Sequence, residues 1–344
     1  MRWWIAFGLA GCVLGCGEDG GSPATGGSGG GGGSAGGLGS GGSVSGSGGS
    51  SPYCQPTGPT LATLGANAVT IDQALPGGLG LSGPAANAAG VYWYKDMQGI
   101  LRVAPGSTTP EVVVAGAAAG PLVSASAVYW VTSTGELWRA PLASLPATGA
   151  KLADGVPTTS AIYAADEASF YFSDLANHRI MSLPVAGGTA TEFLPNVDVA
   201  AMTLHGGYVY YVANRIAYRI AYGATTPEQI SPMSDLSLTA IATDGTTLFW
   251  ADQDTLKQTP IGSPTQESTL GEADFFDSLQ LSGTRVYYQE SRNPTVGWFA
   301  TDGSSCGLAV ADSSIIGTGF VVDEQHVYFV LGSFDDERLL RVPK

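Results

Sequence analysis

The residue type that most often performs catalysis is scarce in this chain. Its 344 residues include three histidines, His178, His205 and His326. Each falls in a predicted turn, and none has a serine or cysteine partner at a spacing typical of nucleophilic catalysis. The sequence therefore predicts solvated turn histidines and no three-histidine metal site.

Carboxylates are the more numerous candidates for chemistry. The chain holds 29 Asp and Glu against 14 Lys and Arg, which gives a net charge of −15. This excess argues against DNA or RNA as a partner, because phosphate binding needs clustered basic residues. Six aspartates near the ends of aromatic segments form a predicted ligand face: Asp96, Asp174, Asp252, Asp254, Asp335 and Asp336.

These aspartates fit three interpretations. They could attract a cation or a basic partner, they could include a carboxylate pair for glycoside hydrolysis, or they could simply be good turn formers. The last is favoured, since no pair stands out from the rest. No cofactor is predicted. Ca²⁺ is the alternative that oxygen ligands would suit, although the sequence has no Asp-x-Asp-x-Asp-Gly loop.

Two of the four cysteines lie in the body of the chain, at Cys54 and Cys306. An oxidising compartment favours a disulfide between such a pair. Cys306 begins a predicted outer strand that neighbours the one following Cys54, so a bond that clamps the two is feasible. Two separate thiols are the alternative, since the sequence does not establish the geometry.

The N-terminus has the pattern of an export signal. Met1-Arg2 gives a basic start, and residues 3–14 are largely apolar but shorter than the about 20 residues that a spanning helix needs. Leu9-Ala10-Gly11-Cys12 and Val13-Leu14-Gly15-Cys16 both resemble bacterial lipoprotein signals. We favour Cys16, because it leaves a longer apolar run. Cys12 and an ordinary secretory signal are the alternatives.

The lipoprotein resemblance implies a membrane anchor without a spanning helix. It implies removal of residues 1–15, lipids on Cys16 and, because Gly17 and not Asp follows, the outer membrane or cell surface. Residues 16–50 then form a tether, since positions 17–50 hold 18 of the 50 glycines and almost nothing apolar to bury. Residues 51–344 are the predicted folded domain.

An internal repeat organises that domain. A pair of aromatic residues after an apolar one recurs seven times, in steps of 37, 42, 39, 39, 38 and 41 residues. The repeats are Val91-Tyr92-Trp93, Val128-Tyr129-Trp130, Phe170-Tyr171-Phe172, Val209-Tyr210-Tyr211, Leu248-Phe249-Trp250, Val286-Tyr287-Tyr288 and Val327-Tyr328-Phe329.

Each repeat reads as four short strands, because β-branched and aromatic runs alternate with Gly, Pro, Asn and Asp. The sequence therefore predicts an all-β, seven-bladed β-propeller, with six blades as the alternative. The seventh repeat ends after its third strand. We expect residues 60–65 to supply the missing fourth strand and close the ring, and residues 66–78 to be an insertion before the first blade.

Parts of the repeat resemble a known family. Tyr171-Phe172-Ser173-Asp174 and Phe249-Trp250-Ala251-Asp252 resemble the Tyr-Trp-Thr-Asp (YWTD) repeats of the low-density-lipoprotein-receptor type. The Asp is displaced to Asp96 in the first repeat and is missing from the second and sixth. That family has six blades, so the resemblance implies a propeller and places the blade count in question.

The combined pattern favours a tethered binding or scaffold module that is not an enzyme. The expected partners are the membrane, through the lipid anchor, and a protein, a glycan or a cationic ligand at the acidic face. No nucleic acid is expected, and the chain should be a monomer. The alternative is an exported hydrolase or lyase that uses carboxylates of the acidic face, since propellers serve both roles.

Overall fold

The aromatic repeats form the second strands of seven four-stranded antiparallel sheets. The computed structural model describes residues 54, 56–73, 83–117, 120–158, 161–290, 292–313, 315–332 and 337–344. The predicted signal, Cys16, the tether, Asp335 and Asp336 lie outside these residues.

The first three repeats form blades 1 to 3, in chain order. Blade 1 contains β2 (Ala85–Asn87), β3 (Gly90–Lys95), β4 (Gly99–Val103) and β5 (Glu111–Ala115). Blade 2 contains β6 (Leu122–Val123), β7 (Ala127–Val131), β8 (Leu137–Pro141) and β9 (Ala150–Ala153). Blade 3 contains β10 (Tyr163–Ala165), β11 (Ser169–Asp174), β12 (Arg179–Pro184) and β13 (Thr191–Pro195).

The next three repeats continue this order. Blade 4 contains β14 (Ala201–His205), β15 (Tyr208–Ala213), β16 (Ile216–Ala221) and β17 (Glu228–Gln229). Blade 5 contains β18 (Ala240–Thr243), β19 (Thr247–Ala251), β20 (Thr255–Pro260) and β21 (Ser268–Glu272). Blade 6 contains β22 (Phe276–Ser282), β23 (Arg285–Glu290), β24 (Thr295–Ala300) and β25 (Cys306–Ala311).

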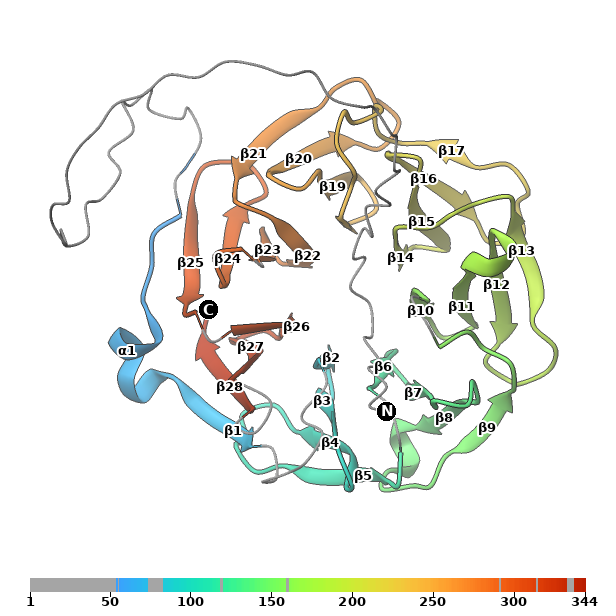
Figure 1. Ribbon diagram of the computed structural model, residues 1–344, viewed down its shortest axis with the longest axis horizontal. Coiled ribbons are helices and arrows are strands. Elements are labelled where there is room, and N and C mark those ends of the chain that lie inside the picture. Colours follow the sequence, from blue (N-terminus) through green and yellow to red (C-terminus); the bar gives the residue numbers. More distant parts are fainter. Residues whose placement is uncertain are drawn as a thin grey trace, which may run out of the picture. The chain divides into compact units, whose positions relative to one another are not determined.

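Blade 7 combines the two ends of the domain. It contains β26 (Ile315–Val322), β27 (His326–Leu331), β28 (Arg338–Pro343) and, as its outermost strand, β1 (Val69–Gln73). Each innermost strand contacts those of two neighbouring blades, and β2 contacts both β6 and β26, so the ring is closed (Figure 1). The seven-bladed prediction is confirmed, and the six-bladed alternative is wrong.

The prediction of the closing strand is wrong in its position. Residues 60–65 do not pair with blade 7: Thr60 caps the short helix α1 (Leu61–Leu64), and the 3₁₀ turn η1 (Gly65–Asn67) follows it. The Thr63 backbone N–H donates to Thr60 Oγ1 at 3.3 Å, and leucine and alanine favour the helix. The β-branched run from Val69 to Ile71 forms the closing strand, so residues 66–73 of the predicted insertion belong to the ring closure, and residues 74–78 lie outside the described residues.

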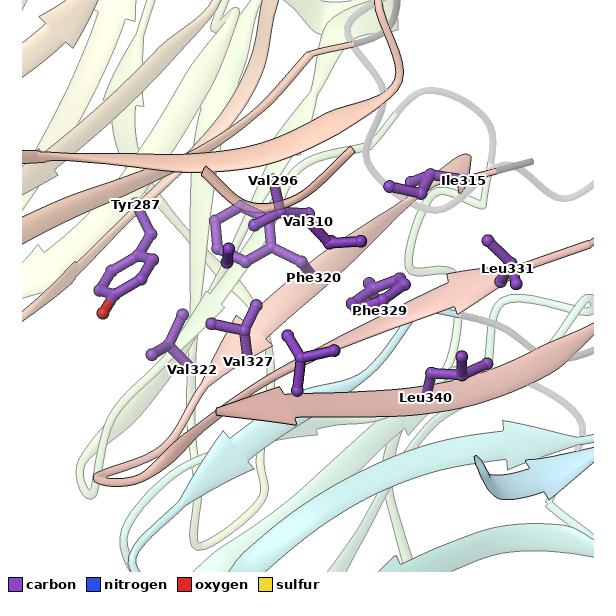
Figure 2. Close-up of a cluster of buried hydrophobic side chains, with 12 residues drawn as sticks. Tyr287, Val296, Val310, Ile315, Phe320, Val322, Val327, Phe329, Leu331 and Leu340 are labelled. Carbon is purple, nitrogen blue, oxygen red and sulfur yellow. The ribbon is translucent and has the colours of Figure 1, made fainter. Parts of the chain in front are cut away.

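The core lies between the blades. The described residues of blades 6 and 7 enclose one buried cluster, in which Val296 and Val310 meet Phe320, Phe329 and Leu340 (Figure 2). Similar clusters fill the other blade boundaries, so the second strands are buried on both faces. Two further 3₁₀ turns, η2 (Leu142–Ser144) and η3 (Leu175–Asn177), lie in connections. Within the described residues, no helix is long and apolar enough to cross a bilayer.

Candidate functional site

One face of the ring gathers most of the irregular connections. Every innermost strand begins at this face, which we call the entry face. Because neighbouring strands of a blade are antiparallel, the turns between second and third strands lie there too, together with the crossovers into the next blade. The turns between first and second strands lie at the opposite face. A ligand at the entry face would therefore meet segments from every blade.

A cavity of about 350 Å³ lies where the innermost strands begin. Residues at or just before the starts of β2, β6, β10, β14, β18 and β22 line it. This volume falls within the range of small-molecule sites in proteins, about 300–1,000 Å³. The cavity is the mouth of the central channel, and we refer to it as the channel mouth.

The wall of the channel mouth is mainly apolar. Blades 2 and 3 supply its aromatic residues Tyr129, Trp130, Tyr163 and Phe170, and aliphatic residues of blades 4 and 5 continue it. Burial raises the pKa of Tyr163 to about 12, so its hydroxyl is neutral at physiological pH. Among the described residues of the lining, Asp277 is the only Asp, Glu, Lys, Arg or His.

Asp277 is presented by a β-bulge. The pairing of β22 with β23 shifts register between Phe276 and Ser278, so Asp277 is the extra residue of the inner strand. Blade 7 also shifts register, between Ile315 and Phe320, whereas the described strand pairs of blades 1 to 5 end before the corresponding position. Bulges of this kind redirect a side chain and are over-represented next to active sites.

Ser278 follows Asp277 in the same wall. Its hydroxyl Oγ is buried, and no hydrogen-bond partner for it exists among the described residues. A hydroxyl shielded from water without a partner costs free energy, because it loses its bonds to solvent. A ligand with a polar hydrogen or a lone pair at this point would recover that loss.

A buried carboxyl lies behind Asp277. Glu290, the last residue of β23, is 8% exposed and accepts a hydrogen bond from the Thr295 hydroxyl at 3.2 Å. Burial raises the pKa of Glu290, and the negative charges of Asp274 and Asp277 raise it further, whereas the bond from Thr295 lowers it. When two neighbouring carboxyls lie in different environments, their pKa values differ, and one can act as a general acid while the other acts as a general base.

None of the predicted ligand-face aspartates that the structure describes lines the channel mouth. Asp174 binds Asn177 and Arg179, and Asp252 binds the Ser234 hydroxyl at 3.0 Å and lies 3.4 Å from Lys257 Nζ. Asp96 accepts a bond from the Tyr94 hydroxyl, and Asp254 from that of Thr255. The four lie at turns of the entry face and share no partner in these contacts.

Acidic residues also lie at the opposite face. At the opposite face, Asp166, Asp244 and Asp323 each accept two backbone N–H groups in the turn between first and second strands. Burial raises the pKa of Asp244, whereas the hydrogen bonds from the Thr247 and Thr246 amides lower it. The net result is a lowered pKa. These aspartates stabilise turns, as the turn-former interpretation predicts.

The histidines lie at two faces. His178 is in the entry-face turn of blade 3, where its Nδ1 is 2.6 Å from Asp198 Oδ1 and both side chains are largely exposed. His205 ends β14 and His326 begins β27, both at the opposite face. Over the residues that the structure describes, no three His, Cys, Asp or Glu side chains are grouped to hold a metal ion.

The two body cysteines are bonded. Cys54 and Cys306 form a disulfide with their Cα atoms 5.9 Å apart. The following segment runs beside β25, where the Leu308 and Ala311 N–H groups donate to Thr57 and Pro59. This places the start of the described chain on blade 6, away from the channel mouth.

Comparisons with known proteins support the fold. No protein-family model and no curated protein matches the chain. Its structure is similar to the WD40 domain of Neurospora crassa Pan2, with a TM-score of 0.57 and 7% identity over 80% of this chain and 96% of that one. It is also similar to a streptogramin B lyase, with a TM-score of 0.54 and 15% identity over 80% and 97%.

A third similar structure is the extracellular domain of the hybrid two-component system BT4673 from B. thetaiotaomicron. Its TM-score is 0.55 with 12% identity, and the match covers 79% of this chain but 39% of that one. At such identities the similarity shows the fold alone. The chain is therefore a β-propeller whose candidate site is the channel mouth of its entry face.

Proposed function

We propose that this chain is an exported, lipid-anchored binding module that takes a small ligand into the channel mouth. The observation that carries this proposal is the cavity itself, because it is of ligand size and its mainly apolar wall includes the adjacent polar residues Asp277 and Ser278.

The anchor is the second part of the proposal. Cys16 would carry the lipids, and residues 17–50 would act as a flexible tether of about 30–35 Å root-mean-square span. The Cys54–Cys306 disulfide supports export, since such bonds persist in oxidising compartments. Mass spectrometry of the mature N-terminus tests the anchor: we expect a lipid-modified Cys16 as the first residue. An unmodified Cys16, or cleavage elsewhere, would contradict it.

Ligand binding is tested by filling the channel mouth. Ala201 lies in the lining at the start of β14, so Ala201→Trp should occupy part of the cavity. With 2-naphthalenemethanol as a neutral probe, we expect titration calorimetry to show that Ala201→Trp weakens binding at least about tenfold, because the probe loses its apolar contacts.

The matched control places the same side chain elsewhere. Ala186 is exposed in the turn after β12, and Ala186→Trp should bind the probe as the parent protein does. Equal binding by the parent and Ala201→Trp would show that the probe binds outside the cavity. Failure of neutral, cationic and anionic naphthyl probes alike to bind the parent would remove the channel mouth as a ligand site.

A second candidate function is an exported hydrolase or lyase. It is favoured by one observation, the pairing of Asp277 in the lining with Glu290, whose raised pKa suits a general acid. One of the similar folds is a lyase by its description. Recovery of a bound ligand chemically unchanged after prolonged incubation supports the binding module, whereas its conversion supports this second function.

A further inference from the structure

We propose that the ligand of the channel mouth is an organic ammonium ion, with its positive group against Asp277 and Ser278 and its apolar body on the wall of blades 2 and 3. This inference rests on the proposed binding function and specifies the chemical class of the ligand. Four features of the site support it.

The first feature is the charge of the lining. The described residues that line the channel mouth contribute one carboxylate, Asp277, and no Lys, Arg or His. A carboxylate or phosphate ligand would therefore meet no cation there, and it would be repelled by a protein of net charge −15. An ammonium ion is attracted by the same field, and its hydrogen bonds to a carboxylate are charge-assisted.

The second feature is the backbone. The strand pairs of blades 1 to 5 end before the corresponding position, and blade 7, whose pairing reaches it, shifts register between Ile315 and Phe320. A bulge re-aims the side chain of its extra residue. In blade 6 that extra residue is Asp277, which supplies the one charged side chain among the described residues of the lining.

The third feature is the division of the wall. The polar pair comes from blade 6, whereas Trp130 and Phe170 come from blades 2 and 3, which are separated from blade 6 by blades 7 and 1 in one direction and by blades 4 and 5 in the other. The cavity therefore has a polar side and an apolar side. A ligand with one charged end and one apolar end matches both.

The fourth feature is the polar surroundings of Asp277. The buried hydroxyl of Ser278 lacks a partner among the described residues and can accept an ammonium N–H. Asp274 lies close enough to Glu290 to influence its charge, and the Asp274 carboxylate adds negative potential on this side. A neutral ligand would use the hydroxyl but would gain little from the carboxylates.

The test uses three probes with one ring system and different charges. These are 2-naphthylmethylammonium, the neutral 2-naphthalenemethanol and the anion 2-naphthoate, titrated calorimetrically at neutral pH and low salt. We expect the cation to bind at least about tenfold more tightly than the alcohol, since hydrogen bonds to charged groups are the stronger ones, and the anion to bind most weakly.

Substitution of the carboxylate assigns the difference. Asp277→Asn should lose at least about tenfold in affinity for the cation while its affinity for the alcohol stays within about twofold. The unchanged alcohol shows that the variant is folded. The matched control is Asp254→Asn, which removes an exposed carboxylate of the same face outside the lining and should alter neither affinity.

The outcomes separate the two proposals. Equal affinities of the parent for cation and alcohol, or a cation affinity that Asp277→Asn leaves unchanged, would overturn the ammonium assignment while the channel mouth remained a ligand site. Binding of none of the three probes would overturn the binding site itself. Tighter binding of the anion than of the cation would also overturn the ammonium assignment, because it would show that the site attracts negative charge.

Discussion

Replacing Asp72 with alanine should lower the free energy of unfolding by about 3–5 kcal/mol, the usual cost of removing one partner of a buried ion pair. Asp72 lies on β1, the strand that closes the ring. Its Oδ1 is 2.6 Å from Lys95 Nζ, and its Oδ2 accepts a hydrogen bond from Trp93 Nε1 at 2.8 Å. The Asp72 and Lys95 side chains are only 10% and 9% exposed.

The size of this effect follows from what remains after the substitution. The Lys95 ammonium group of blade 1 would lose its counter-ion, and the Trp93 N–H would lose its acceptor. Lys95 and Trp93 belong to blade 1 and Asp72 belongs to blade 7, so these contacts connect the first and last blades. Urea denaturation followed by tryptophan fluorescence measures the loss.

Two further variants show whether burial of the pair is the cause. Replacing both groups, as Asp72→Leu with Lys95→Met, should recover much of the stability, since no charge is then left unpaired. Lys151, which is 41% exposed and pairs with Glu136 and Asp154, is the matched surface control, and Lys151→Met should have little effect. An Asp72→Ala loss no larger than that of Lys151→Met would contradict the explanation.

The ion pair between Asp72 and Lys95 also explains a departure of the first repeat from the YWTD pattern. Lys95 pairs with Gly99 at the position where Asp174 and Glu290 pair with Arg179 and Thr295 in blades 3 and 6. Blade 1 therefore has a cation where other blades have an acid, and β1 supplies the carboxylate. Asp96, which the sequence suggested as the displaced acid, instead accepts a bond from Tyr94.

The aromatic second strands of the repeat made the propeller and its blade number predictable. The fourth strands have a weaker sequence pattern, so the position of the closing strand was harder to predict. Aromatic second strands recur because they pack against both neighbouring blades, so their spacing gave the blades and their number. Fourth strands carry no such constraint, so the repeat pattern predicts residues 60–65 as the closing strand, whereas the β-branched run from Val69 to Ile71 forms it. Strand propensity alone would have favoured the second segment.

The candidate site was less accessible to sequence reasoning for a physical reason. Turn acids such as Asp174 and Asp252 are conspicuous in a repeat, but their partners are within reach of their own turns and crossovers. The channel mouth is built from the starts of the innermost strands, the least regular part of each repeat. Asp277 owes its place to a register shift, which is a property of strand pairing and leaves no local sequence signal.

Removing the disulfide should have the other large effect on stability. Cys54 and Cys306 are 252 positions apart, and a loop of this length is worth about 5 kcal/mol in the chain-entropy model. Measured values for native disulfides are about 2–5 kcal/mol, so we expect a loss in this range for the variant Cys54→Ser with Cys306→Ser. Urea denaturation with and without a reducing agent measures it.

The position of the bond indicates why the native fold would not compensate for its loss. The segment after Cys54 adds to β25 through Thr57 and Pro59, continues into α1, and reaches the closing strand β1. Leu61 and Leu64 pack against the cluster between blades 6 and 7. The disulfide thus holds one end of the segment whose other end closes the ring.

Comparison of the oxidised and reduced proteins separates the bond from the side chains. The parent protein under reducing conditions should unfold at the same urea concentration as the double serine variant, whereas the oxidised parent should unfold at a higher one. The single variant Cys54→Ser controls for a free thiol at Cys306. Coincident unfolding curves for oxidised parent and double variant would show that the ring closes without help from the bond.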